Sequence, residues 1–304
     1  MGIVRGSARL LLDEAHRRPF TGTVLQLART SIFFTEAELR RWARKHGVAL
    51  AADAATSLSH DPRLAMQGCL SDRSFFHLLG FDQVVSADIS DYEGADILWD
   101  LNQPAPETLY ERFDLVFEGG TIQHIFDLRQ VFANIHSTLK TGGRVIHAMS
   151  PSNNHVDHGF YMFSPTLFAD TYSTFGYRIE TIYLCDFLPF WFHGRLFSRP
   201  FRIYRYLPGS LDHLSYGRWG NRQTNIFVVA TKLPGASSEA VPQQGQYRRL
   251  WAKAQAGHTS GAPAPSIQAS NPRHASRLML AWKLVRELSR RFGPKKRPPT
   301  IARY

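Results

Sequence analysis

The chain of 304 residues carries a formal net charge of +11 and contains only two cysteines. The whole excess charge lies in residues 233–304, which hold 13 Lys and Arg against two acids, whereas residues 1–232 hold 23 side chains of each sign. The basic character therefore describes the tail and gives no information about a substrate of the preceding region. Cys69 and Cys185 lie far apart, which argues against a disulfide scaffold or a zinc ribbon.

No stretch of the sequence has the pattern of a membrane segment or a secretion signal. Nowhere do eighteen apolar residues run together, which excludes a spanning helix. The first twenty residues have an apolar run only at 8–12, where Arg9 interrupts it, so they do not predict a signal peptide. We expect a cytoplasmic protein, with a peripheral position at the inner membrane face as an open alternative.

Strand and helix patterns alternate from Gly22 onward. Residues 23–27 form a short apolar run that predicts a buried strand. Thr35 and Glu38 make a capping box at the start of a helix. Apolar residues at helical spacing predict further helices at 121–140 and 164–175. Four more strands are predicted at 84–88, 95–99, 113–117 and 144–149.

The last two predicted strands lie close to the basic tail. Residues 179–184 and 225–231 have no clear helix between them, and we expect them to pair antiparallel at one edge of the sheet. The aromatic and basic segment 187–222 separates them and is predicted to be a lid or an added subdomain. Residues 1–232 are thus predicted to form one Rossmann-like α/β domain, with a seven-stranded, mostly parallel sheet and an antiparallel edge hairpin.

The tail is predicted to have two parts. Residues 233–272 are rich in Ala, Gly, Ser, Pro and Gln and predict a flexible linker. Residues 273–304 predict a basic amphipathic helix, which ends near Gly293, and a terminal basic cluster. Its apolar stripe favours an anionic membrane surface over nucleic acid as a partner. A solvated tail without a partner is an open alternative.

Polar residues and glycines stand where the predicted strands end, which is where open parallel sheets bind ligands. Asp88 ends the second strand and is suited to accept hydrogen bonds from a ribose diol. Asp100 ends the third strand, where it can accept from an adenine amino group or close a turn on its own backbone. Glu118 and Gly119 end the fourth strand, and the glycine suits either a close ligand or a simple turn.

The segments 84–102, 113–126, 139–146 and 153–165 together resemble the later motifs of class I S-adenosylmethionine-dependent methyltransferases. The likeness is greatest to a bacterial subgroup associated with polysaccharide and surface-glycan biosynthesis. The resemblance implies S-adenosyl-L-methionine as cofactor and no bound metal. It departs at Ala28, which stands where the family has a glycine and whose methyl group forbids a positive φ. The cofactor-binding residues implied are Leu27, Ala28, Asp88, Ile89, Asp100, Leu101, Glu118 and Gly119.

Acceptor chemistry is predicted in the segment after the fifth strand. Methyl transfer to a hydroxyl needs a base, and His155 and His158 stand at the expected site with Asp157 between them. The acid can fix the tautomer of a neighbouring histidine. The same cluster could bind a divalent metal or serve only to hydrogen-bond its own loop.

The sequence therefore predicts a methyltransferase that acts on a hydroxyl or related group of a saccharide or other small metabolite. The alternative is a non-catalytic methyltransferase-like binding or scaffold protein, whose basic tail contacts a membrane surface or nucleic acid.

Overall fold

The computed structural model describes residues 2–52, 54–187, 201–210, 222–259 and 302–303. These residues divide into two units, of which the larger contains the main sheet and the smaller contains helix α7. The main sheet of the larger unit has nine strands in the described part of the chain. In spatial order they are β11 (Ala302–Arg303), β9 (Arg202–Arg205), β8 (Tyr177–Phe187), β10 (Gln223–Lys232), β7 (Leu139–Asn153), β6 (Phe113–Glu118), β2 (Thr23–Leu27), β4 (Gln83–Asp88) and β5 (Ile97–Leu98).

The sheet is parallel on one side and antiparallel on the other. Strands β5, β4, β2, β6 and β7 are parallel to one another, whereas β10 is antiparallel to both β7 and β8. The predicted antiparallel pairing of 179–184 with 225–231 is thus present, but the prediction of seven strands with this pair at the edge is wrong. The short strands β9 and β11 continue the sheet beyond β8, and they come from segments without a recognisable strand pattern.

The helices of the larger unit are α1 (Arg5–Arg17), α2 (Glu36–His46), α3 (Pro62–Ala65), α4 (Asp72–Leu78), α5 (Leu128–Thr138) and α6 (Pro165–Thr174), with 3-10 turns η1 (Glu107–Leu109) and η2 (Ile122–His124). The predicted capping box of Thr35 and Glu38 is confirmed at α2. The predicted helix at 121–140 is instead the turn η2 followed by α5, because Asp127 caps a new helix by accepting from the Gln130 amide.

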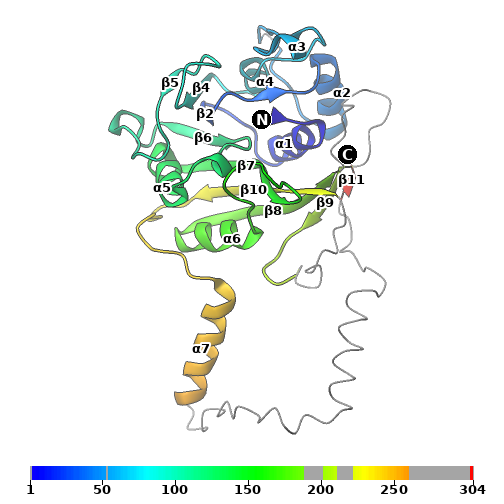
Figure 1. Ribbon diagram of the computed structural model, residues 1–304. Coiled ribbons are helices and arrows are strands. Elements are labelled where there is room, and N and C mark those ends of the chain that lie inside the picture. The colour runs from blue at the N-terminus through cyan, green and yellow to red at the C-terminus, as the bar shows by residue number, and fades with distance from the viewer. Residues whose placement is uncertain (1, 53, 188–200, 211–221, 260–301, 304) are drawn as a thin grey trace. The chain divides into compact units, whose positions relative to one another are not determined.

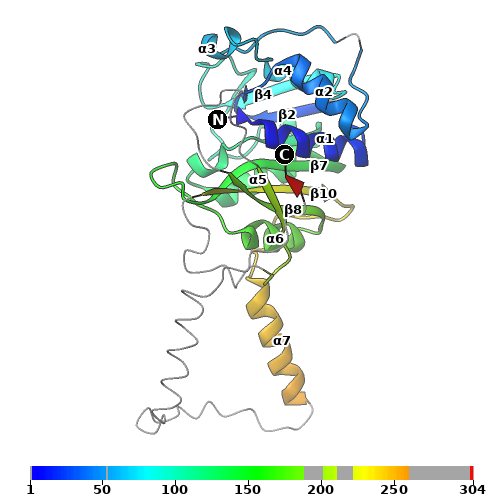
Figure 2. The same cartoon turned by 90° about the vertical axis from the view of Figure 1, so that its right-hand side faces the viewer.

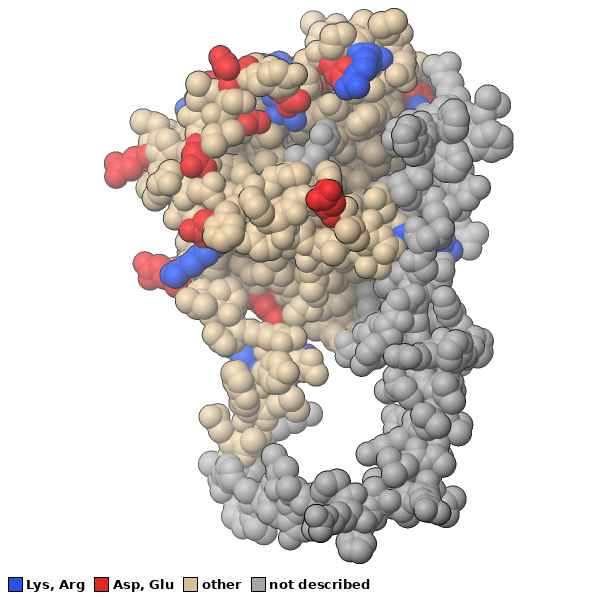
Figure 3. Space-filling view, in the orientation of Figure 1, with Lys and Arg blue, Asp and Glu red and all other residues tan. Residues whose placement is uncertain are grey.

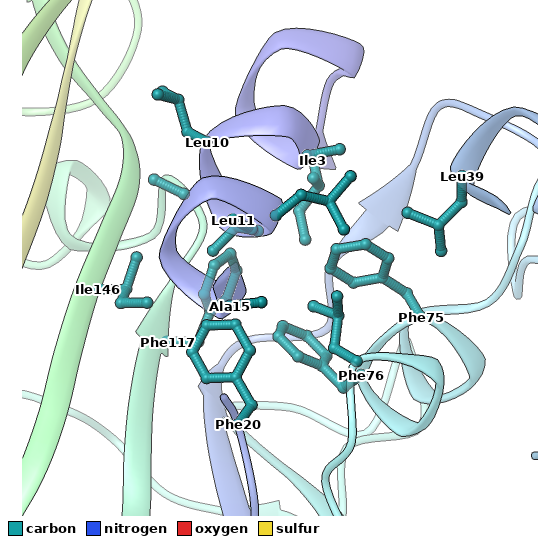
Figure 4. Packing of buried hydrophobic residues seen from close by; sticks show 14 of the residues in the cluster. Ile3, Leu10, Leu11, Ala15, Phe20, Leu39, Phe75, Phe76, Phe117 and Ile146 are labelled. Carbon is teal, nitrogen blue, oxygen red and sulfur yellow. The ribbon is translucent and has the colours of Figure 1, made fainter. Parts of the chain in front are cut away.

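Helices cover both faces of the sheet (Figures 1 and 2). Ile146 of β7 belongs to an apolar cluster that includes Leu11 of α1 and Phe75 of α4 (Figure 4). The next residue, His147, contacts the ring of Phe168 in α6 at a centroid distance of 4.8 Å. Since neighbouring side chains of a strand point to opposite faces, α1, α2 and α4 cover one face and α6 covers the other. Both faces are therefore closed, which leaves the strand ends for a ligand.

The N-terminal segment, which the sequence patterns left without an element, adds to this arrangement. Its strand β1 (Gly2–Ile3) pairs in parallel with β3 (Ser31–Ile32), which directly follows the loop that leaves β2. A Cβ on Gly2 would clash with the Ser31 carbonyl oxygen and the Phe33 ring. Phe34, just after β3, is buried in the core and packs against Phe75.

The smaller unit contains α7 (Gly245–Thr259), which lies within the predicted flexible linker. That prediction is wrong for these residues, because Tyr247, Leu250 and Trp251 recur at helical spacing and Gly245 is followed by good helix formers. The predicted amphipathic helix of the tail lies outside the described residues, as does most of the predicted lid at 187–222. Among the described helices, none has both the length and the hydrophobicity to cross a membrane.

Candidate functional site

The carboxyl ends of the parallel strands lie along one edge of the sheet. From β2 the chain moves outward to β4 and β5, and it then crosses to β6 and β7 on the other side of β2. Strands β2 and β6 therefore border the point at which the strand order reverses. Open α/β sheets bind ligands at such a switch point. The loops that leave these five strands carry all the residues predicted for the site.

Ala28 follows β2 and has the backbone conformation of a glycine. Its φ is +65°, and its amide donates to the Ala87 carbonyl oxygen of β4 at 2.8 Å. The prediction that an alanine forbids a positive φ here is wrong. A residue with a Cβ pays about 1–2 kcal/mol for this conformation, so other contacts must hold the loop in place.

Arg29 makes those contacts. Its guanidinium binds Asp72, the first residue of α4, through two bonds, Nε to Oδ2 at 2.6 Å and Nη2 to Oδ1 at 2.7 Å. Its Nη1 donates to the carbonyl oxygens of Glu93 and Gly94 in the loop between β4 and β5. The Arg29 side chain is only 9% exposed and that of Asp72 is fully buried. One buried arginine thus joins the loop after β2 to two neighbouring segments.

The charge of this pair is well compensated. Burial raises the pKa of the Asp72 carboxyl, but the hydrogen bonds and charge of Arg29, with a further bond from Gln26, outweigh it and lower the pKa below 3.8. Asp72 is therefore ionised at neutral pH. A bidentate arginine and carboxylate pair with these low exposures is a rigid connection.

Asp88 is the last residue of β4, Asp100 follows the neighbouring strand β5 by two residues, and both are half-buried. Oδ1 of Asp88 accepts from the Ser90 amide at 3.3 Å, and Oδ1 of Asp100 accepts from both the amide and the side chain of Asn102. The turn expected as the alternative role of Asp100 is thus present. Within the described residues, Oδ2 of each aspartate accepts no hydrogen bond, so one oxygen of each carboxylate is free to take a ligand.

The apolar residues predicted beside these positions differ in exposure. Leu27 and Leu101 are buried, with 2% and 3% exposure, so only their backbone can reach a ligand. The Leu27 carbonyl oxygen is already bonded to Thr121 Oγ1 at 2.6 Å. Ile89 is 69% exposed and can contact a ligand with its side chain.

Glu118 differs most from the prediction. Its side chain is fully buried, and Oε1 accepts from the amides of Gly120 and Thr121. Oε2 accepts from Ser150 Oγ at 2.9 Å and pairs with His147 Nδ1 at 3.0 Å. With both oxygens occupied, the carboxylate shapes the loop after β6 and does not face a ligand.

A buried network supports Glu118 from the α6 side of the sheet. His147 Nε2 lies 2.6 Å from the Tyr172 hydroxyl, so the ring bridges a helix and the carboxylate. Burial raises the pKa of Glu118, but the bond and charge of His147, with the bonds from Thr121 and Ser150, outweigh it and lower the pKa below its ordinary value. Glu118 is therefore an ionised anchor of this loop.

The loops after β2 and β6 touch at Gly119. A Cβ on Gly119 would lie 3.1 Å from the Phe117 ring and 3.2 Å from the Thr30 side chain. The side chains beneath this position leave little room, so a glycine keeps the backbone within reach of a ligand. Gly119 is thus consistent with its predicted role.

The segment after β7 brings the predicted acceptor residues to the same edge. The rings of His155 and His158 have centroids 6.0 Å apart, and His124 of η2 lies 5.1 Å from His158. His124 therefore joins the cluster. His158 is exposed, whereas His155 is half-buried.

The predicted pairing of Asp157 with a histidine does not occur. Asp157 is exposed, has a φ of +61°, and makes no hydrogen bond to His155 or His158 among the described contacts. Burial and the charge of His158 lower the pKa of His155, whereas the Thr224 backbone and the Asn225 side chain act in the opposite direction. His155 is consequently neutral at pH 7 and able to accept a proton.

Three residues of the site region were not identified from sequence as parts of the site. Arg29, His147 and Tyr172 reach it through buried contacts with partners 43, 29 and 25 residues away along the chain. An arginine directly after a buried strand is a usable signal, since its charge must be compensated there. His147 and Tyr172 have no such signal, because their positions in β7 and α6 resemble ordinary core positions.

Neither a protein-family model nor a curated protein matches the chain. Solved structures resemble its fold. A 1,6-didemethyltoxoflavin-N1-methyltransferase of Burkholderia thailandensis with bound S-adenosylhomocysteine is 12% identical, over 74% of this chain and 76% of that one, with a TM-score of 0.34. An S-adenosylmethionine-dependent methyltransferase of Mesorhizobium loti is 15% identical over 75% and 99%, with a TM-score of 0.33. A protein of Methanococcus maripaludis is 14% identical over 47% and 55%, with a TM-score of 0.26, so this chain spans about half of its length.

Proposed function

We propose that this chain is an S-adenosylmethionine-dependent methyltransferase that methylates a hydroxyl group of a saccharide or other small metabolite. The observation that carries the proposal is the placement of Asp88 and Asp100. Asp88 ends β4 and Asp100 closely follows β5 at the same edge of the sheet, and each keeps one carboxylate oxygen unbonded among the described residues. The saccharide acceptor follows from the sequence resemblance to surface-glycan methyltransferases.

The donor set at this edge fits a nucleoside cofactor. The free oxygen of Asp88 suits a ribose diol, as acids at the end of this strand do in dinucleotide-binding folds. The free oxygen of Asp100 suits the amino group of an adenine. Gly119 permits a close approach to the backbone between the loops after β2 and β6. Glu118 is excluded as a ligand contact because its carboxylate is fully engaged.

The residues after β7 supply the acceptor chemistry in this proposal. S-adenosylmethionine, when bound, supplies an electrophilic methyl group. The acceptor oxygen forms the new bond to carbon as the carbon–sulfur bond breaks, and the hydroxyl proton must pass to a base. His155 and the exposed His158 are the candidate bases for that proton in this proposal. Asp157 makes no contact that would orient either ring.

Calorimetric titration with S-adenosylhomocysteine tests the proposed cofactor directly. The wild-type protein should release heat on binding, and Asp88→Ala should weaken binding at least tenfold, because a ribose hydroxyl that loses a charged acceptor costs about 1.5–3 kcal/mol. Asp91→Ala is the matched control, since Asp91 is an exposed acid on the same loop. A folded wild-type protein without any heat of binding would exclude the proposal.

The same titration distinguishes a methyltransferase from the alternative, a non-catalytic scaffold protein. A non-catalytic scaffold protein with this fold would not bind S-adenosylhomocysteine. One observation favours it, because the buried Glu118 and the Arg29 contacts show that much of the polar chemistry of the edge serves structure. Most of residues 273–304 lie outside the described residues, so the peripheral contact predicted for them stays a prediction.

A further inference from the structure

Two loops at the candidate site hold large apolar side chains in solvent. Phe126 follows η2 and is 71% exposed, and Phe160 follows β7 and is 65% exposed. Their rings contact each other edge to face, with centroids 5.8 Å apart. Val156 and Met162, on the same loop as Phe160, are also exposed, at 84% and 51%. We call Phe126 and Phe160 the aromatic platform.

Hydrogen bonds, rather than burial, hold the platform in place. The Tyr161 hydroxyl donates to the Phe126 carbonyl oxygen at 2.7 Å, and the Phe160 amide donates to the Gln123 carbonyl oxygen at 2.7 Å. A Cβ on Gly159 would clash with Gln123, so the two loops are closely joined. The exposed rings are thus fixed to the loop that carries His124.

The loop after β7, which carries Phe160, has an unusual backbone conformation. Asn154 and Asp157 have φ values of +58° and +61°, and Gly159 has +84°. Three left-handed residues within six positions are unusual, even though Asn and Asp accept this conformation better than most residues. Strained backbone and ordered, exposed apolar rings in the same loop both point to a ligand.

The chemistry around the platform limits what that ligand can be. The segments 121–127 and 154–162 contain two acids, Asp127 and Asp157, and no Lys or Arg. A phosphorylated or carboxylated acceptor would therefore meet repulsion and no cation. The same two loops carry three histidine rings, since His158 contacts His124 and neighbours His155. The surface thus combines an apolar ring face with nearby groups for a hydroxyl.

We propose that the aromatic platform is the acceptor subsite and that it takes an uncharged alcohol built on a ring. The apolar face of the ring lies against Phe126 and Phe160, and its hydroxyl reaches the histidine cluster. This inference rests on the proposed function for its chemical meaning, because the histidines act there as the base. It adds a substrate class, an uncharged ring-bearing acceptor, and it names the two side chains that select it.

The proposal can be tested by measuring how phenyl β-D-glucopyranoside binds to the full chain. Saturation-transfer NMR in the absence of cofactor is the measurement. Wild-type protein should show transfer to the probe, and the double variant Phe126→Ser and Phe160→Ser should bind at least tenfold more weakly. Glucose 6-phosphate, an anionic probe, should bind the wild type more weakly than the glucoside. Probe binding that the double variant leaves unchanged, or no binding to wild-type protein, would overturn the platform, and tighter binding of the phosphate would overturn the proposed selectivity.

Two comparisons keep the outcome specific. The control variant Leu58→Ser and Val241→Ser removes two exposed apolar residues outside these loops and should bind the glucoside as the wild type does. Calorimetry with S-adenosylhomocysteine on the same proteins should show equal cofactor binding in the wild type and both double variants. Failure of the wild type to bind the cofactor rejects the proposed function. If the cofactor binds but the wild type and the double variant Phe126→Ser and Phe160→Ser bind the glucoside equally, only the platform is rejected.

Discussion

The loops that leave β2 and β7 reach the same edge of the sheet but are built in opposite ways. The loop after β2 is fixed by charge, because Arg29 is buried and bound to Asp72 and to two backbone carbonyl oxygens. The loop after β7 has polar contacts that hold apolar rings outward, so that Phe160 is 65% exposed. The loop after β2 thus contains a buried charge, whereas the loop after β7 carries an exposed hydrophobic surface.

The difference indicates a division of work at the site. In the proposed function a fresh S-adenosylmethionine binds in every turnover, and a loop held by a buried bidentate pair would give it a fixed binding surface. An acceptor must be selected among many metabolites, and exposed rings of defined orientation provide a surface for that selection. On the face shown in Figure 3, Lys and Arg side chains lie among Asp and Glu side chains. The local contacts of each loop, rather than the overall charge, therefore define its role.

Breaking the charged loop should have the largest effect on the folded state. Asp72→Ala leaves the Arg29 guanidinium buried without its partner, which should destabilise the protein by about 3–5 kcal/mol in urea unfolding. The control Asp91→Ala removes an exposed acid in the loop after β4 and should change stability little. Equal effects of the two changes would contradict the role assigned to the buried pair.

The same pair should give a defined pH dependence. The folded-state pKa of Asp72 lies below the ordinary 3.8, so its ionisation contributes stability above that value, and the contribution is lost as pH falls through the lower folded pKa. The difference in unfolding free energy between wild type and Asp72→Asn should therefore shrink below about pH 4. A difference that stays constant from pH 7 to pH 3 would show that the charge of Asp72 is not what holds the loop.

Removing the charge of Glu118 should have the next largest effect. Glu118→Gln keeps the size of the side chain, but its amide group cannot accept all four hydrogen bonds that the carboxylate receives. We expect a loss of about 1–3 kcal/mol in urea unfolding. Binding of S-adenosylhomocysteine should also weaken, because the loop with Gly119 loses its anchor. Unchanged stability would mean that the network with His147 is dispensable.

The sequence predicted the strands and the strand-end acids of this site better than its supporting contacts. Asp88 and Asp100 were found because a local pattern, an acid after an apolar run, marks the end of a strand. The role of Glu118 was missed because its partners His147 and Ser150 lie on another strand, and local patterns carry no information about such pairs. Helix α7 was missed because averaging the composition of 233–272 hid the spacing of Tyr247, Leu250 and Trp251.

Relieving the strain at Ala28 should have a smaller effect, and in the opposite direction. Ala28→Gly removes a cost of about 1–2 kcal/mol for the left-handed conformation. Glycine also makes the unfolded chain more flexible, which costs about 0.4–1 kcal/mol. We expect a net stabilisation between about 0 and 1.6 kcal/mol in urea unfolding, with cofactor binding retained. The same exchange at Ala43, a buried helical position of α2, should destabilise the protein instead.

The smallest effect on stability is expected at the aromatic platform. Phe126→Ser and Phe160→Ser together remove side chains that are mostly in solvent, so the unfolding free energy should stay within about 0.5 kcal/mol of the wild-type value per site. Solubility should rise, since exposed apolar rings promote association. A large loss of stability would show that the rings serve folding rather than binding, and the contrast between the two loops would then disappear. If the exposed rings serve binding, the double variant should keep its stability and lose glucoside binding.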